Sequence, residues 1–322
     1  MIGIALVGAG TVAELYARAI PKTRDARCAG VFDPGAAKAR ALADRLGGRA
    51  YDSFDALLGD EAASAALILT PTPSHVELAR RCLEAGKHVL VEKPVAATVA
   101  DIDLLDAAAR AAGRACMPAH NYIYTPSMRR ARHLVEENAF APVTSFWGMY
   151  NIFHDDALAA RYGGVLRAVS IHHAYSLLYL LGRPRHVTAV ASRTRPNLGD
   201  EDQVMVICVM ETGAIATLWA SFAADDMTND PWTVMYKLLG ARGGISYSWN
   251  EARFRDDGGP AWGIPAYVDS FAAELECFVD QVIGAGEPAL STLADARDAL
   301  RIIEAAERSI AVGQARVPVD YG

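Results

Sequence analysis

The feature that most constrains the fold of this chain is an apolar run that ends in a glycine turn. Ile4–Val7 is continuously apolar, and the segment Gly8-Ala9-Gly10-Thr11-Val12-Ala13 follows it directly. This is G-x-G-x-x-A between a predicted strand and a predicted helix, an arrangement that binds the diphosphate of a dinucleotide. Small residues permit the tight turn, let the diphosphate approach the backbone, and let the helix pack on the strand. The predicted cofactor contacts here are Gly8, Gly10, Thr11 and Val12.

An acidic residue completes this motif. Asp33 ends the next apolar run at 33 − 10 = 23 positions after the second glycine. A carboxylate at roughly 20 residues from the turn binds the adenosine ribose. Asp33 can accept hydrogen bonds from both ribose hydroxyls and would repel a 2′-phosphate, which favours NAD over NADP as cofactor. Lys38 and Arg40 follow on the next predicted helix, where they either soften this preference or form a solvated helix face.

Length, charge and cysteine content exclude several classes of protein. The 322 residues are enough for two domains, and a net charge of −7 argues against a nucleic-acid partner. The five cysteines form no C-x-x-C pair, so neither a disulfide framework nor a cysteine zinc site is predicted. No apolar stretch reaches membrane-spanning length, and the N-terminus lacks the basic region of a signal sequence. We therefore expect a cytoplasmic protein without a membrane partner.

The order of predicted elements divides the chain at residue 118. Continuous apolar runs alternate with helical segments over 1–118, which predicts an α/β fold with a doubly wound parallel sheet that binds the dinucleotide. Capping boxes are expected at two of its helices, Ser74 with Glu77 and Thr98 with Asp101.

Residues 119–322 have a different pattern. Long strand-like segments joined by short turns predict an α+β substrate domain with an open, mostly antiparallel sheet. An apolar sheet face left open by helices tends to find a partner, so we expect a homodimer or homotetramer through this sheet.

A second motif lies at the end of a predicted parallel strand. Residues 85–94 read Ala-Gly-Lys-His-Val-Leu-Val-Glu-Lys-Pro, which places Glu92 and Lys93 at the carboxyl edge of the sheet, where open α/β folds bind ligands. A lysine that is partly buried or beside a positive nicotinamide ring loses its proton more easily, and can polarise a substrate oxygen. The alternative is a surface ion pair between Glu92 and Lys93.

Together with the glycine turn, this segment resembles the glucose–fructose oxidoreductase, inositol dehydrogenase and MocA family. Further matches are Thr70-Pro71-Thr72-Pro73 with His75, and the Gly-Gly-Val-Leu segment that leads to His172. The resemblance covers essentially the whole chain. It implies a nicotinamide cofactor, hydride transfer at a hydroxyl or carbonyl of a small polyhydroxylated substrate, and a cis peptide before Pro94. It also implies that Lys93 contacts substrate and that Thr70, Pro71, His75, Glu92 and Lys93 line the cofactor.

The chain departs from the family pattern at one catalytic position. The family has an aspartate four residues before its histidine; here His172 falls on the histidine and Ala168 on the aspartate. On a regular helix the two positions would share a face. His172 can still serve as general base, because its unperturbed pKa lies near neutrality. Its orientation must come from elsewhere, and the candidate carboxylates are Asp155, Asp156, Glu201 and Asp202.

Other polar residues are candidates for binding the substrate. The string from His120 to Tyr124 begins the second domain, and Asn121 and Tyr122 could supply amide and hydroxyl groups to a polyol. His154 and His173 are further candidates, although His173 would point about 100° away from His172 and is more simply packed. The spacing of the histidines matches no zinc signature, so no metal is predicted.

These observations favour an NAD-dependent dehydrogenase acting on a sugar, sugar acid or cyclitol, with Lys93 and His172 as catalytic residues. One alternative is a lyase or glycosidase that uses bound NAD only transiently. Another is a nucleotide-binding regulator that has lost the catalytic carboxylate.

Overall fold

The computed structural model describes residues 1–223, 234–248 and 265–322. The chain forms two compact units. Unit 1 comprises residues 1–124 and 267–297, and unit 2 comprises residues 125–266 and 298–322. The segment 267–297 thus belongs to unit 1 although it follows most of unit 2 in the sequence. The predicted boundary at residue 118 places this segment in the second domain.

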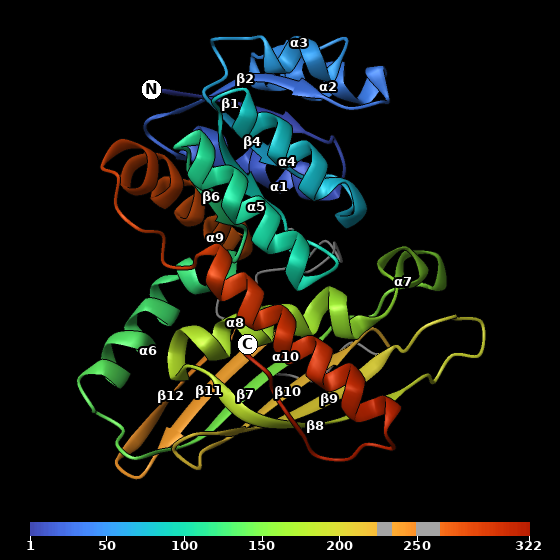
Figure 1. Cartoon of the computed structure of the whole chain (residues 1–322), viewed down its shortest axis with the longest axis vertical. Helices are drawn as coiled ribbons and strands as arrows, with labels where there is room; N and C mark the ends of the chain where they lie inside the picture. Colours follow the sequence, from blue (N-terminus) through green and yellow to red (C-terminus); the bar gives the residue numbers. More distant parts are fainter. Residues whose placement is uncertain (224–233, 249–264) are drawn as a thin grey trace. The chain divides into compact units, whose positions relative to one another are not determined.

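Unit 1 is built on a parallel sheet of six described strands in the order β3-β2-β1-β4-β5-β6 (Figure 1). The strands are β1 (Ile2–Val7), β2 (Ala26–Phe32), β3 (Arg49–Ala50), β4 (Ala65–Ile68), β5 (His88–Val91) and β6 (Cys116–Pro118). Residues 4–7 of β1 have no solvent exposure, as expected for the centre of a sheet with helices on both faces. The order reverses between β1 and β4, which is where ligands bind in doubly wound sheets.

Unit 1 also contains helices from two parts of the chain. They are α1 (Thr11–Ala19), α2 (Ala36–Leu46), α3 (Phe54–Leu58), α4 (His75–Glu84) and α5 (Val99–Ala112), with α9 (Pro265–Glu276) and a π-helical segment, Cys277–Gly284, from the later part of the chain. The last pair joins unit 1 partly through a buried hydrogen bond, in which the Tyr16 hydroxyl in α1 donates to Glu274 Oε2 at 2.7 Å. Glu274 has no solvent exposure, and burial raises its pKa well above the usual value. Burial thus favours the protonated form of this carboxyl group.

Unit 2 is built on a mixed sheet of seven described strands in the order β12-β11-β7-β10-β9-β8-β13. The strands are β7 (Val143–Asn151), β8 (Pro184–Ser192), β9 (Gln203–Met210), β10 (Ile215–Ser221), β11 (Val234–Gly240), β12 (Gly243–Ser248) and β13 (Val317–Pro318). Among these described strands only β7 and β10 pair in parallel; the other neighbours pair antiparallel. The expected mostly antiparallel sheet is confirmed, and so is the α/β fold class.

Helices of unit 2 lie along one face of this sheet (Figure 1). They are α6 (Pro126–Glu136), α7 (Asp156–Tyr162), a π-helical turn at Leu166–Ser170, α8 (Ile171–Leu181) and the part of α10 (Leu293–Ala311) from residue 298 onward. The burial of β9 follows this arrangement, because Val204, Val206 and Cys208 are buried while Met205 and Ile207 between them are exposed. The side chains of β9 thus alternate between a covered and an open face.

The open face of the unit 2 sheet is apolar. We call Trp147, Val190, Met205, Ile207 and Ile215 the open-face patch; each is between 38% and 52% exposed. The strand register places Trp147 beside Thr217 and Thr217 beside Ile207, and Val190 beside Met205. The patch therefore spans four neighbouring strands, β7, β10, β9 and β8.

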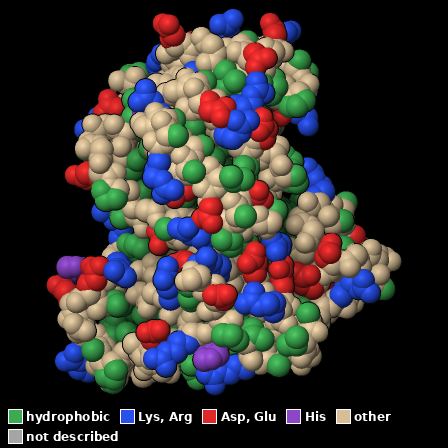
Figure 2. Space-filling model, in the orientation of Figure 1, with side chains coloured by type: hydrophobic (Ala, Val, Ile, Leu, Met, Phe, Trp, Pro, Cys, Tyr) green, Lys and Arg blue, Asp and Glu red, His purple; other side chains and the backbone are tan. Residues whose placement is uncertain are grey.

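The charged surface is mixed. Basic and acidic side chains are interspersed over the face drawn in Figure 2.

Candidate active site

The glycine turn of unit 1 has the geometry that a dinucleotide site needs. Gly8 adopts φ +105°, and Gly10 is the residue before α1 and is exposed. Asp33 lies against this turn: its Oδ2 accepts from Ala9 N at 2.8 Å and its Oδ1 accepts from Gly35 N at 2.7 Å. Because each carboxylate oxygen can accept more than one hydrogen bond, Asp33 can still receive ribose hydroxyls. A dinucleotide fits the residues present.

The start of α1 adds to this site. The preceding residue, Gly10, provides no side-chain cap for the first turn, and a Cβ built on it would meet nothing within 4 Å. The first N–H groups of a helix have no partner within the helix and attract an anion. Thr11 is exposed and Val12 half-buried at the same end of the helix.

Two further segments of unit 1 meet through His75. The His75 side chain is buried, its Nε2 lies 2.6 Å from the Thr70 carbonyl oxygen, and its Nδ1 lies 2.9 Å from the Pro94 carbonyl oxygen. Burial lowers the pKa of His75, although the carbonyl contacts oppose this effect. Thr70 and Pro71 follow β4, while Pro94 follows β5 and the cis Lys93–Pro94 peptide, which confirms the expectation for that bond. His75 thus braces the ends of two adjacent strands.

Glu92 and Lys93 occupy different environments. Glu92 is 7% exposed, and its Oε2 accepts from the backbone N of Lys93 at 2.9 Å. Burial raises the pKa of Glu92 to about 7, against the opposing charge of Lys93. Burial also lowers the pKa of the half-buried Lys93, and Glu92 opposes that shift. Glu92 is therefore a buried carboxyl group, whereas a surface ion pair would leave it exposed.

The segment after β6 packs inside unit 1. His120 Nδ1 lies 2.7 Å from Ser291 Oγ, and the Asn121 side-chain amide donates to Ser270 Oγ at 2.9 Å. Burial lowers the pKa of His120 to about 3, with a smaller contribution from the charge of Lys93. Tyr122 is 2% exposed. The polar string predicted to face a polyol is thus largely buried against the returning segment 267–297.

His172 lies at the second position of α8 in unit 2. Its Nδ1 is 2.6 Å from the hydroxyl oxygen of Tyr175, one helical turn later, and the two rings meet edge to face. The preceding π-helical turn contains Ala168. The family spacing of four residues assumes a regular α-helix, so the wider turn alters the relation between position 168 and the histidine. Tyr175 is absent from the candidates that the sequence suggests, although its spacing of three residues from His172 is a readable signal.

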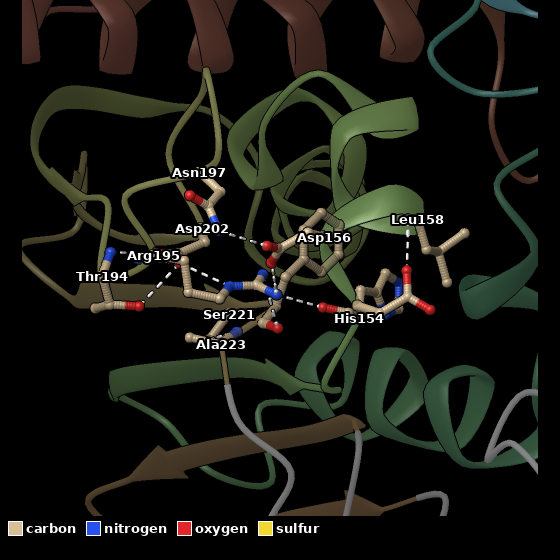
Figure 3. A network of polar contacts seen from close by, with 11 residues as sticks. His154, Asp156, Leu158, Thr194, Arg195, Asn197, Asp202, Ser221 and Ala223 are labelled. Atoms are coloured by element: carbon tan, nitrogen blue, oxygen red, sulfur yellow. Dashed lines mark hydrogen bonds and ion pairs between the residues drawn. The ribbon is translucent and has the colours of Figure 1, made fainter.

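Each candidate carboxylate has another structural partner. Asp155 Oδ1 accepts from Leu158 N at the start of α7, and Glu201 Oε1 accepts from Leu166 N at the start of the π-helical turn. Asp156 and Asp202 both contact Arg195 (Figure 3). Burial raises the pKa of Asp202, but hydrogen bonds from Thr194 and Arg195 outweigh this effect, and the net shift is downward.

Arg195 connects the end of β7 with the ends of two other strands (Figure 3). Its guanidinium donates to the carbonyl oxygens of His154 at 2.5 Å and Phe222 at 3.3 Å, and its Nε lies 3.2 Å from Asp202 Oδ2. The His154 ring stacks on Phe222 with centroids 4.3 Å apart. The guanidinium thereby fixes the backbone that carries His154, a role that no motif in the sequence indicates.

His173, in α8, packs against the sheet of unit 2. It has no solvent exposure, its Nδ1 lies 3.0 Å from the Tyr236 hydroxyl, and its Nε2 lies 3.2 Å from the Trp219 carbonyl oxygen. Burial lowers its pKa to about 3. A neutral imidazole with both nitrogens engaged by protein groups suits packing better than substrate binding.

The described residues contain neither a metal-ligand cluster nor a membrane-spanning helix. Across 1–223, 234–248 and 265–322, His, Cys, Asp and Glu form no group of three or more that could hold a metal ion. Within the same part of the chain, no helix combines the length and apolarity needed to cross a membrane. The cytoplasmic location stays a prediction.

The fold and the glycine-turn site define a dinucleotide-binding α/β protein with a second, sheet-based unit. A model described as an oxidoreductase family with an NAD-binding Rossmann fold matches residues 2–120, and the GFO/IDH/MocA C-terminal domain matches residues 128–246. The chain belongs to this oxidoreductase family, which confirms the resemblance.

Relatives and solved structures agree with this assignment. The chain is 28% identical to D-xylose 1-dehydrogenase (NADP(+)) 2 of Haloferax volcanii, over 87% of this chain and 88% of that protein. It is 27% identical to inositol 2-dehydrogenase of Rhizobium meliloti, over 95% and 96%. The fold matches a putative myo-inositol dehydrogenase from Sinorhizobium meliloti 1021 with a TM-score of 0.88, at 24% identity over 99% of this chain and 100% of that one. These findings support a dehydrogenase and give no support to the lyase or regulator alternatives.

Proposed function

We propose that this protein is an NAD-dependent dehydrogenase that acts on a hydroxyl group of a sugar, sugar acid or cyclitol. The observation that carries the proposal is the Asp33 carboxylate, which accepts from Ala9 N in the glycine turn at 2.8 Å. This contact supports an acidic group at the position where the adenosine ribose binds. The substrate class rests on the names of the xylose and inositol dehydrogenases to which the chain is similar.

The preference for NAD rests on charge. A 2′-phosphate carries negative charge at neutral pH, and Asp33 beside the ribose would repel it. The name of the Haloferax volcanii relative includes NADP(+), so similarity to it does not by itself favour NAD. We propose NAD as the better cofactor of this chain and NADP as the weaker one.

The proposed chemistry divides between two side chains. A bound nicotinamide supplies the hydride acceptor for the substrate carbon. Lys93 orients the substrate oxygen and steadies its developing negative charge; because burial lowers its pKa, its proton is held less firmly than that of a solvated lysine. His172 removes the hydroxyl proton at Nε2, since its Nδ1 faces Tyr175.

The remaining predicted contacts receive different roles. We retain Gly8, Gly10, Thr11, Val12, Thr70, Pro71 and Glu92 as cofactor-lining candidates, and Asn121, Tyr122 and His154 as substrate-binding candidates. We assign His75 to bracing the two strand ends, because both its ring nitrogens face backbone carbonyls. We assign His173 to packing for the same kind of reason.

We also propose a homodimer or homotetramer that buries the open-face patch. Its five members are large apolar residues, more than a third exposed, on adjacent strands of one sheet. Contiguous exposed apolar surface of this kind marks association sites. A second copy fits because an isologous interface needs a self-complementary surface, and a flat apolar sheet can pair with itself.

The function is tested by a reduction screen. Purified protein is mixed with NAD or NADP and a panel of aldoses, sugar acids and inositols, and the absorbance of reduced nicotinamide is followed. We expect at least one member to reduce NAD faster than NADP. Absence of reduction with both cofactors across the panel, in folded protein, would overturn the dehydrogenase proposal.

A variant pair then tests the base. His172→Ala should lower turnover by about 10²- to 10⁴-fold while NAD affinity stays unchanged, because only the proton acceptor is lost. His133→Ala is the control, since His133 is an exposed histidine of unit 2 that pairs with Glu137. A His172→Ala enzyme that keeps the turnover of this control would remove His172 from the mechanism.

A further inference from the structure

The partner of His172 is a phenol from its own helix. Tyr175 Oη lies 2.6 Å from His172 Nδ1, at the short end of hydrogen-bond distances. Both residues are buried, at 2% exposure for Tyr175 and 5% for His172. The ring centroids are 5.4 Å apart and the planes meet at 63°. The histidine ring is thus held both by a directed polar contact and by ring packing.

The helix geometry makes this contact local. Residues three apart lie on the same face of an α-helix, and both side chains belong to α8, which is regular from Ile171 to Leu181. The π-helical turn ends at Ser170, two residues before His172. The orientation of the histidine is therefore set by the regular helix rather than by the irregular turn that contains Ala168.

A histidine that acts as a base must carry no hydrogen on the nitrogen that receives the proton. The neutral ring carries one N–H, and the partner of that nitrogen decides which tautomer is present. If Nδ1 carries the hydrogen and donates to Tyr175 Oη, Nε2 is left as the proton acceptor. If the phenol instead donates to Nδ1, the hydrogen lies on Nε2 and that nitrogen cannot accept a proton.

We propose that Tyr175 is the positioning residue of the catalytic base: its hydroxyl oxygen accepts the Nδ1–H of His172, fixes the ring and leaves Nε2 unprotonated. This rests on the proposed function, in which His172 takes the substrate proton. A phenol carries no charge, so the base is oriented without the cost of a buried carboxylate.

The test compares two tyrosine variants of the same helix. Tyr175→Phe removes only the hydroxyl and keeps the ring, whereas Tyr179→Phe is the control, because Tyr179 is a half-buried tyrosine one turn further along α8. We expect Tyr175→Phe to lower kcat by about 10- to 100-fold, with KM and NAD affinity little changed. This loss is smaller than the loss expected when the general base itself is removed. A purely structural role would instead lower thermal stability and NAD affinity together with kcat.

A second measurement does not depend on activity. Protein labelled with ¹⁵N-histidine is studied by long-range proton–nitrogen correlation, and the His172 signals are assigned by their loss in His172→Gln. We expect the Nδ1-protonated tautomer in the parent and a loss of that preference in Tyr175→Phe but not in Tyr179→Phe.

The outcomes separate the role of Tyr175 from the proposed function. A parent ring protonated at Nε2, or a Tyr175→Phe enzyme with the kcat of the Tyr179→Phe control, would overturn the role of Tyr175. If the parent oxidises no substrate of the panel, the proposed function fails, and the nitrogen spectra alone still decide whether Tyr175 selects the tautomer.

Discussion

The two glycines of the nucleotide turn serve different purposes, and substituting each by alanine separates them. Gly8 has φ +105°, a conformation that L-residues rarely adopt, and a Cβ built on it would lie 2.9 Å from the Leu69 carbonyl oxygen. A non-glycine residue in such a backbone region costs about 1–3 kcal/mol. The contact with Leu69 is to backbone, which cannot rotate away. We therefore expect Gly8→Ala to lower the free energy of unfolding by about 2–3 kcal/mol.

Gly10 has the opposite properties. Its φ is −90°, which alanine adopts readily, and a Cβ would meet nothing within 4 Å. Alanine stabilises the folded state by reducing the entropy of the unfolded chain, but it destabilises the folded state because it caps a helix less well than glycine. These two small effects oppose each other. We expect Gly10→Ala to keep the stability of the parent within about 0.5 kcal/mol. Its methyl group would occupy the space through which a diphosphate approaches the backbone, so NAD affinity should fall at least about tenfold, or about 1.4 kcal/mol.

The assay pairs urea denaturation without cofactor with calorimetric titration of NAD. Gly8→Ala should unfold at lower urea with an unchanged slope, whereas Gly10→Ala should unfold with the parent and bind NAD more weakly. Equal destabilisation by both substitutions would contradict the division of roles. Unchanged NAD affinity in Gly10→Ala would show that the diphosphate does not lie against this residue.

Two further predictions concern charge and association. Burial raises the pKa of Glu92 from 4.5 to about 7. The difference, 7 − 4.5 = 2.5, corresponds to about 3 kcal/mol. Because the folded state binds this proton more tightly than the unfolded state, the free energy of unfolding falls as the pH rises from 4.5 to 7. In urea denaturation, Glu92→Gln should therefore gain up to about 3 kcal/mol relative to the parent between about pH 4 and pH 8, and a pH-independent difference would refute this assignment. Trp147→Glu should convert the homo-oligomer to monomer in sedimentation analysis without changing the circular dichroism, because Trp147 is 43% exposed in the open-face patch. Thr144→Glu, an exposed substitution on the same strand but outside the patch, is its control, and equal dissociation by both would argue against the patch as the interface.

Regular elements with local signals are predictable from the sequence. The predicted cap at Thr98 is confirmed, because its side chain accepts from Asp101 N at the start of the helix Val99–Ala112; Gly113, with φ +61°, ends this helix. The other predicted capping box is wrong: Ser74 donates to Thr70 Oγ1 and the Pro71 carbonyl oxygen, and Glu77 contacts Arg80. The side chains of Ser74 and Glu77 can form either a capping box or these other contacts. The turn that precedes the helix determines which of the two arrangements forms.

Short elements that depend on neighbours are not predictable in this way. The strand Arg49–Ala50 has two residues and exists through its pairing with β2, and the strand Gly243–Ser248 exists through its pairing with β11. Neither has a periodic pattern long enough to read. The helix Asp156–Tyr162 also escapes prediction, although Asp155 is its cap, because seven residues give less than two full turns of apolar periodicity.

The candidate site shows the same division between local and distant information. The glycine turn and Asp33 are predictable because the motif itself encodes their proximity, and the structure joins them through Ala9 N. The burial of His120 and Asn121 is not predictable, because their partners Ser291 and Ser270 lie 171 and 149 residues later in the chain. A polar string therefore does not by itself indicate a binding surface.

The partner of His172 is the instructive exception, since it is local and still absent from the sequence-based candidates. Those candidates are all carboxylates, and each of the four holds a helix start or Arg195 instead. A buried base needs an acceptor for its Nδ1–H, and the chemistry of that acceptor need not be charged. On α8 the position three residues after the histidine satisfies this need through Tyr175. Replacement of an acidic residue in a family motif thus points first to other acceptors within one helical turn.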